Sequence, residues 1–301
     1  MLPIGPRDER LVGAACALGA FLTWGVLPIY FKAIAAAPPL EIVAHRIVWS
    51  ALLLLGVIAL RHRWAALRRG LADRRTRRLL LASTLLVSSN WLIFVWAITS
   101  GRVLESSLGY YINPLMNVLL GLLVLRERLS RVQGLAVLLA AVGVANLAVQ
   151  SAAFPWVSLS LAGTFSLYGL VRKTMALGAL DGLFVETNLL LVPAVIFLAV
   201  QVAGGDSAFL AGDTRLDLLL VLSGLFTTLP LLLFTSAVRR LNYATVGLFQ
   251  YIVPTSHFLL AVFVFGERFT SAHLVTFALI WTALALYSGE VVRVARRRRT
   301  A

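Results

Sequence analysis

Long apolar runs separated by short polar segments dominate the pattern of the chain. A helix needs about 20 predominantly apolar residues to cross the hydrocarbon core of a bilayer. Such runs predict ten transmembrane helices, at 11–32, 39–60, 79–100, 103–125, 132–149, 156–173, 182–202, 216–238, 244–265 and 272–292. The run 156–173 is the weakest, because it is short and rich in Ser and Gly. The pattern therefore predicts an all-α integral membrane protein.

Composition supports the bilayer as the main solvent. Hydrophobic residues make up 60% of the chain and charged residues 13%, about half the charged share of a soluble domain. The first apolar run is long and no small-residue cleavage site follows it, so we expect it to remain as a helix. The single cysteine, Cys16, excludes a disulfide or a cysteine-based metal site within one chain. We expect no cofactor and no metal.

The net charge of +14 would suggest a nucleic-acid partner in a soluble protein. Here the basic residues lie in short segments between apolar runs, which is typical of membrane topology signals. With the N-terminus in the cytoplasm, 22 of the 27 Lys and Arg residues lie on the cytoplasmic side and 4 on the other side. The pattern therefore predicts cytoplasmic N- and C-termini, a basic cytoplasmic tail at 293–301, and no nucleic-acid partner. Topology also explains the arginine-rich segment 61–78, although that segment could instead bind anionic lipid.

The chain repeats itself with an offset of 140 residues. The segments 111–128 and 251–268 are identical at eight of 18 positions, including Pro114 and Pro254 and a Glu-Arg pair. Each proline removes a backbone donor near mid-span and loosens its helix. The two helices are five spans apart, so the copies face opposite ways. We therefore predict two inverted five-helix repeats, 1–150 and 151–292, a plan that recurs in secondary transporters.

Polar side chains occupy matched positions on the two repeated helices. Tyr110, Asn113 and Asn117 fall on one face of the first helix. Gln250 and His257 hold the positions equivalent to Tyr110 and Asn117 on the second helix. Polar residues within spans usually face the bundle interior. We expect these polar stripes to line a central substrate cavity; hydrogen bonding between helices without any solute is the simpler alternative.

Other side chains suit the wall of the same cavity. These further candidates are Trp24, Asn90, Trp91, Tyr168 and Tyr251. Aromatic residues of membrane helices more often belong to the core or to the interface belt. No one of these residues therefore indicates a cavity by itself.

Charged residues lie near the starts of two helices that correspond in the repeats. Glu41 and Glu186 occupy these starts on opposite sides of the membrane, as gate residues or as carboxylates stabilised by the helix dipole. His45 follows Glu41 by four residues, and Arg46 is expected to snorkel outward or to pair with a carboxylate. No carboxylate lies at mid-depth of a predicted span. Proton coupling through a buried acid is therefore not expected, and His257 is the only mid-span histidine that could titrate usefully.

Several stretches resemble the EamA-type branch of the drug/metabolite transporter superfamily, and within it the RarD family. They are TWGVLPIYFK (23–32), EIVAHRIVWS (41–50), NWLIFVWAITSGRVLESSLGYYINPLMNVLLGLLVLRERLS (90–130), LYGLVRK (167–173), ETNLLLVPA (186–194) and RRLNYATVGLFQYIVPTSHFLLAVFVFGE (239–267). The resemblance covers most of the chain. It implies ten helices in two inverted EamA repeats, a central cavity, and efflux or exchange of amino acids, related metabolites or drugs.

We therefore predict a secondary transporter that exports or exchanges small metabolites, amino acids or drugs across the bacterial inner membrane by alternating access. Its expected partners are a small-molecule substrate and the lipid bilayer, and the sequence leaves the substrate, direction, coupling ion and oligomeric state open. A non-transporting scaffold or sensor is the alternative. An enzyme is not expected, because the chain has neither an HExxH motif nor paired mid-span aspartates.

Overall fold

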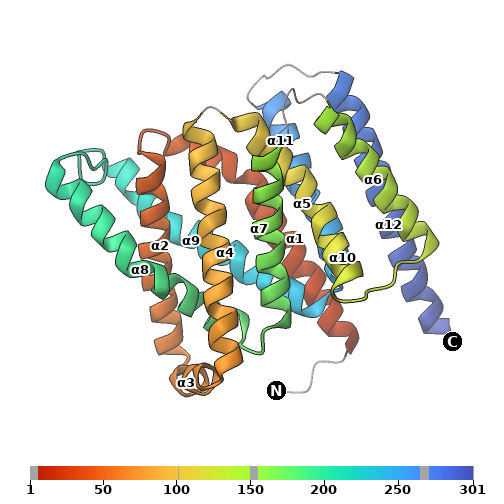
Figure 1. Cartoon of the computed structure of the whole chain (residues 1–301), viewed down its shortest axis with the longest axis horizontal. Helices are drawn as coiled ribbons and strands as arrows, with labels where there is room; N and C mark the ends of the chain where they lie inside the picture. Colours follow the sequence, from red (N-terminus) through yellow and green to blue (C-terminus); the bar gives the residue numbers. More distant parts are fainter. Residues whose placement is uncertain (1–5, 101, 150–154, 265–270, 301) are drawn as a thin grey trace.

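A computed structural model describes residues 6–100, 102–149, 155–264 and 271–300, and all regular structure in these ranges is helical (Figure 1). The helices are α1 (Pro6–Ala33), α2 (Pro39–Leu60), α3 (Trp64–Ala72), α4 (Arg74–Thr99), α5 (Val103–Leu123), α6 (Arg131–Val149), α7 (Trp156–Thr174), α8 (Ala179–Gly204), α9 (Thr214–Arg240), α10 (Tyr243–Phe249), α11 (Ile252–Phe263) and α12 (Ser271–Thr300). The Glu-Arg pair at 267–268 and the junction between the expected repeats at 150–151 lie outside the described residues.

Each expected span coincides with helix where the structure describes it, with ends shifted by up to eight residues, because α12 continues through most of the predicted tail to Thr300. The range 244–265 differs, because it divides into α10 and α11. Pro254 explains the division, since it lacks the amide proton that the carbonyl of Gln250 would accept in a continuous helix. That carbonyl instead accepts from the amide of Val253 at 3.0 Å. Pro114, by contrast, lies inside the uninterrupted helix α5.

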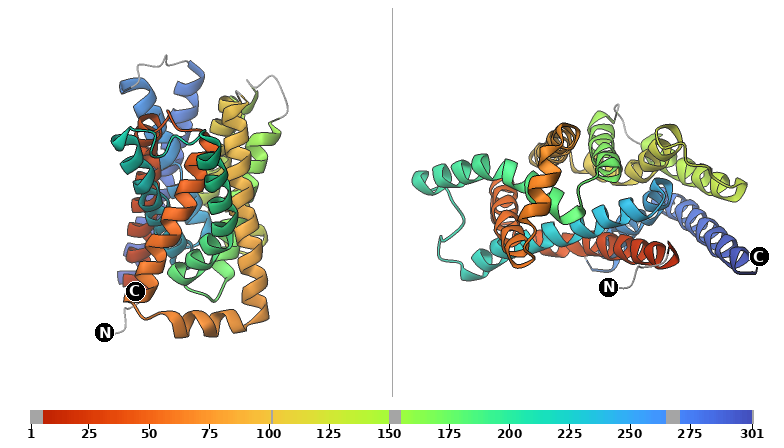
Figure 2. Two further views of the ribbon diagram at one scale, coloured as in Figure 1. Left: turned by 90° about the vertical axis from the view of Figure 1, so that its left-hand side faces the viewer. Right: turned by 90° about the horizontal axis from the view of Figure 1, so that it is seen from below.

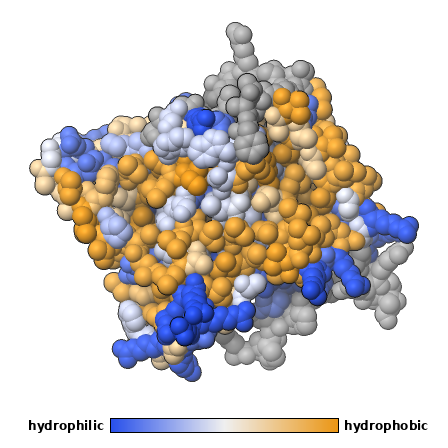
Figure 3. Space-filling model, in the orientation of Figure 1, coloured by the Kyte–Doolittle hydropathy of each residue, from blue (hydrophilic) through white to orange (hydrophobic). Residues whose placement is uncertain are grey.

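The outer surface carries an apolar band between polar ends (Figure 3). Large side chains such as Leu85, Val192 and Ile196 are 58–65% exposed on it, which suits contact with lipid rather than water. Within the described ranges, five helical stretches are long and apolar enough to cross a membrane. They are Glu9–Ala33, Pro39–Leu60, Arg74–Ala97, Ala179–Gly204 and Thr214–Arg240. Shorter apolar stretches lie in α6 and α12.

The long helices form two rows when the molecule is seen from below, with α4, α7 and α5 in one row and α9 and α1 in the other (Figure 2). The main packing partners are α1 with α9, α2 with α8 and α9, α5 with α7 and α10, and α6 with α12. Contacts of α4 with α2, and of α5 with α11, are sparse. The start of α1 and the end of α12 lie at the same end of the bundle (Figure 1). The helices α4 and α5 therefore pack mainly on α7, and α5 also on α10.

The arginine-rich segment 61–78 contains a short helix that the hydropathy pattern did not indicate. This helix, α3, lies crosswise at one end of the bundle (Figure 2, left). Leu67 is buried beneath it, while Arg68 and Arg69 are exposed. An apolar anchor with basic residues on the other side is typical of a helix in the membrane interface. Asp73 then caps α4, because its carboxylate accepts from the amide of Thr76 at 2.8 Å.

Candidate functional site

The polar stripe on α5 forms hydrogen bonds to neighbouring helices. Asn113 is buried, and its side-chain amide donates to the carbonyl of Ala162 at 2.9 Å and to the hydroxyl of Ser166 at 3.2 Å, both on α7. Asn117 is fully buried, and its amide donates to the side-chain oxygen of Gln250 at 2.7 Å. These three predicted site residues thus join α5 to α7 and to the segment between α10 and α11.

The crossing of α5 and α10 is close because a glycine lies at it. A Cβ atom at Gly247 would lie 2.6 Å from the carbonyl oxygen of Pro114 and 2.9 Å from the Cβ of Asn117. Small residues at helix crossings let the backbones approach and bring polar side chains within bonding distance. Gly247 was not among the predicted site residues. The available signal was a small residue three positions before the polar Gln250, on the same side of the helix.

Tyr110, at the other end of the stripe, meets His257 of α11. The two rings are 5.7 Å apart between centroids and stand at 83° to each other. Nε2 of His257 lies 3.2 Å from the carbonyl oxygen of Trp24 on α1, so this nitrogen carries the proton. Tyr110 also contacts Phe94 of α4, yet it remains 36% exposed. Tyr110 therefore keeps a partly exposed side next to residues of α1, α4 and α11.

Trp24 and Tyr168 belong to an aromatic cluster that joins α1, α7 and α9. Trp24 lies 5.6 Å from Phe165 and 5.7 Å from Phe234 between ring centroids. Tyr168 is fully buried and stacks on Phe234 at 6.4 Å. Trp24 is partly buried where it packs on this cluster. Its carbonyl lies beside His257, whereas Tyr168 is fully enclosed.

Arg46 extends from α2 toward α1, α4 and α9. Its Nε donates to the hydroxyl of Thr227 at 2.8 Å. Its guanidinium carbon lies 5.1 Å from the ring centre of Trp91 and 5.7 Å from that of Phe31, within range for cation–π attraction. Asn90, the neighbour of Trp91, bonds to α7 instead. Of these two predicted candidates on α4, Trp91 lies beside the charge and Asn90 holds helices together.

Tyr251 and the two prolines lie apart from this accessible region. Tyr251 is fully buried in a cluster formed with α6 and α12. Its hydroxyl has no hydrogen-bond partner among the described residues. Pro114 and Pro254 are also buried. The structure therefore does not bring Tyr251 to Tyr110 and Arg46.

Glu41 ties the start of α2 to the loop before α9. Its buried carboxylate accepts from the hydroxyl of Ser207 at 2.7 Å and from the amides of 208–209 at 3.0–3.2 Å. Nε2 of His45 is 3.9 Å from this carboxylate, and Nδ1 of His45 accepts from the indole of Trp49 at 3.1 Å. Glu41 and His45 thus fix one end of the bundle.

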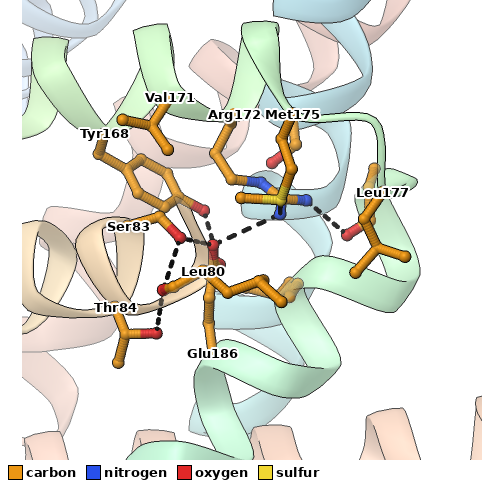
Figure 4. A network of polar contacts seen from close by, with 12 residues as sticks. Leu80, Ser83, Thr84, Tyr168, Val171, Arg172, Met175, Leu177 and Glu186 are labelled. Carbon is orange, nitrogen blue, oxygen red and sulfur yellow. Dashed lines mark hydrogen bonds and ion pairs between the residues drawn. The ribbon is translucent and has the colours of Figure 1, made fainter. Parts of the chain in front are cut away.

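Glu186 forms a buried network (Figure 4). Its carboxylate lies 3.4 Å from Nη1 of Arg172 and accepts from Ser83 at 2.5 Å and from Tyr168 at 3.2 Å. Both charged residues are almost completely buried, so the pair ties α4, α7 and α8 together. This role of Arg172 was not predicted from the sequence, where a basic residue at a helix end counts as a topology signal. The available clue was that Tyr168 and Arg172 are four residues apart on one helix face.

Two hollows lie elsewhere. One, of about 520 Å³, opens between α2 and α8 beside His45 and Trp49, and the other, of about 800 Å³, lies along α3 at Trp64 and Arg68. Among the described residues, no group of three or more His, Cys, Asp or Glu could hold a metal ion. The Arg46–Tyr110 region is therefore the candidate site on account of its residues, not of a large hollow.

Known proteins place this fold in a family. The sequence pattern of the EamA-like transporter family matches residues 11–149. An uncharacterized transporter from Vibrio cholerae is 47% identical over 98% of both chains, and Protein RarD from Escherichia coli is 41% identical over 95% of this chain and 96% of its own. A crystal structure covers 92% of this chain and 97% of its own at a TM-score of 0.69, and its 17% identity supports the fold alone. The chain therefore belongs to the EamA-like transporter family of multi-pass membrane proteins, with close relatives named RarD.

Proposed function

We propose that the protein is a secondary transporter that moves small metabolites, amino acids or drugs across the bacterial inner membrane by alternating access. In this proposal ten helices cross the membrane as two inverted repeats, 1–150 and 151–292, with both termini and the basic tail 293–301 in the cytoplasm. The cavity lies beside Trp24, Trp91, Tyr110 and His257. The other members of the polar stripes hold its walls together.

One pair of contacts carries the proposal. The 140-residue offset pairs Tyr110 with Gln250 and Asn117 with His257. The observed contacts join Asn117 to Gln250 and Tyr110 to His257. A two-fold axis would convert one contact into the other, as in an interface between two identical surfaces. Two antiparallel copies of one unit, packed against each other at the stripes, account for this reciprocity.

The ends of the bundle supply the gates that alternating access requires. The buried Arg172–Glu186 pair joins α4, α7 and α8 at the end that the distribution of basic residues assigns to the cytoplasm. Glu41 joins α2 to the loop before α9 at the other end. Glu41 lies in the first turn of α2, whereas Glu186 lies seven residues inside α8 and not at the helix start that the sequence predicts. We assign to them the closing of opposite ends of the pathway.

Transport is tested with purified protein in proteoliposomes over a panel of amino acids, other metabolites and drugs. Circular dichroism before and after reconstitution confirms that the protein is folded, and protein-free liposomes give the background. Flux of at least one compound above background is expected. Folded protein that moves no member of the panel contradicts the proposal and favours the scaffold or sensor.

A further inference from the structure

Arg46 lies inside the bundle at the depth of the accessible region. Arg46 and Tyr110 are each seven residues from the starts of α2 and α5, and Trp91 is eight residues from the end of α4. At 1.5 Å per residue these side chains lie about 10–12 Å from one end of their helices. The guanidinium is also close enough to the hydroxyls of Tyr30 and Tyr110 for an electrostatic interaction. Aromatic rings and hydroxyls from α1, α4, α5 and α9 thus lie around one positive charge on α2.

This charge has no acidic partner in the described part of the chain. None of the ion pairs found there involves Arg46. Glu41, the acid on the same helix, is occupied by Ser207 and the amides of 208–209. The expected pairing of Arg46 with a carboxylate is therefore not observed within the described residues.

The terminal nitrogens of Arg46 face accessible space. Only Nε has a hydrogen-bond partner among the described residues, namely Thr227. Nη1 and Nη2 are not among the enclosed atoms that lack a partner, so the guanidinium keeps some accessible surface although most of the side chain is buried. Charged groups within a membrane bundle are costly and mark pathways for ions and solutes. A guanidinium presents a planar pair of donors that matches a carboxylate.

We infer that Arg46 is the anion subsite of the transport cavity and that the solute is a small carboxylate with an apolar or aromatic remainder. The carboxylate bonds to Nη1 and Nη2, and the remainder packs against Trp91, Tyr110 and Trp24. A zwitterionic amino acid is disfavoured, because no described carboxylate adjoins Arg46 to receive its ammonium group. This inference rests on the proposed function and names its substrate class.

Binding is tested without flux, by quenching of intrinsic tryptophan fluorescence and by thermal shift of the purified full-length protein in detergent. The probes are phenylacetate, phenylpyruvate, phenylacetamide and phenylalanine, all at one chloride concentration. Phenylacetate or phenylpyruvate is expected to bind at least about tenfold more tightly than phenylacetamide or phenylalanine. If the wild-type protein binds the acid and the amide equally, or binds neither acid, the inference is wrong. This result needs no variant.

Variants locate the subsite. Arg46→Gln should weaken binding of the acid at least about tenfold and leave the amide unchanged, and Arg46→Lys should have an intermediate effect. Arg102→Gln is the matched control, since Arg102 also lies 5.4–5.5 Å from two tryptophan rings but pairs with Glu105 at 3.2 Å. Acid binding that survives Arg46→Gln, or is lost equally in Arg102→Gln, overturns the assignment. Flux of any panel compound, acid or neutral, by the wild type in proteoliposomes leaves the transporter proposal standing even if acid binding survives Arg46→Gln, whereas folded wild-type protein that moves none of them contradicts that proposal.

Discussion

The side-chain amide of Asn117 donates a 2.7 Å hydrogen bond to the side-chain oxygen of Gln250, 133 positions further along the chain. Both residues are buried, so water cannot replace either partner. The bond joins α5 to the segment between α10 and α11, next to the point where Gly247 lets the backbones of α5 and α10 approach. It therefore links the packing of the proposed repeats to the position of Tyr110 and His257.

A double-mutant cycle measures this bond. Asn117→Ala and Gln250→Ala should each lower the free energy of unfolding by about 1–2 kcal/mol, because each leaves a polar group unpaired inside the bundle. The double variant should lose less than the sum, with a coupling of at least about 0.5 kcal/mol. Unfolding in mixed detergent followed by circular dichroism gives the values. Strict additivity would show that the two side chains do not interact.

Gly247→Ala should destabilise the protein by about 1–3 kcal/mol, since the new Cβ would meet the backbone of α5 at Pro114. Gly163→Ala on α7 is the matched control, because no atom lies within 4 Å of its added Cβ. The control should change stability by less than about 1 kcal/mol. Comparable melting temperatures for both variants would argue against the close crossing of α5 and α10.

Arg172→Met should lower stability by about 3–5 kcal/mol, because it leaves the carboxylate of Glu186 buried without its partner. Combining it with Glu186→Gln should recover part of the loss, since the remaining group is then neutral. Arg293→Gln removes an exposed pair with Glu290 and should cost about 1 kcal/mol or less. Thermal unfolding distinguishes these cases. A loss of about 1 kcal/mol or less in Arg172→Met would mean that water reaches the Arg172–Glu186 pair.

His257→Leu should reduce flux in proteoliposomes by at least about tenfold while the protein stays folded, because it replaces a polar group beside the accessible Tyr110 ring. Tyr251→Phe is the control, since the Tyr251 hydroxyl has no partner among the described residues and lies in the α6–α12 cluster. Its flux should match the wild type. Unchanged flux in His257→Leu would remove this residue from the site.

Reporter insertions test the membrane orientation. Alkaline phosphatase inserted after Gly212, between α8 and α9, should be active because the basic-residue pattern places this loop in the periplasm. The same insertion after His62, between α2 and α3, should be inactive. Activity at both sites, or the reverse order, would contradict the cytoplasmic placement of the termini.

Local chemistry explains why much of the fold could be predicted. Apolar runs of bilayer length lie on helices, and prolines and polar segments mark many of their ends, as Pro38 and Pro39 do before α2. The break at Gln250 follows from the missing amide proton of Pro254. The short helix α3 was not predicted, because its apolar side is only a few residues long and its arginines lower the mean hydropathy of the segment.

The site was less predictable because it depends on how each helix is rotated. Asn113 and Asn117 were placed on one face, but the sequence does not say whether that face meets another helix or open space. Arg46 was expected to pair with an acid or to snorkel, and its aromatic neighbours come from α1 and α4. Likewise the partner of Glu186, Arg172, lies on α7. The positions of these contacting residues along the chain do not indicate that they meet.

The sequence by itself determined the helical segments, the family and the internal repeat, because hydropathy, proline and motif are properties of consecutive residues. The tertiary structure decided which polar groups bond to each other and which one remains accessible. Helices that are apolar on most sides give no amphipathic signal for their rotation. Only their packing could bring Asn117 to Gln250 and leave the terminal nitrogens of Arg46 without a partner among the described residues.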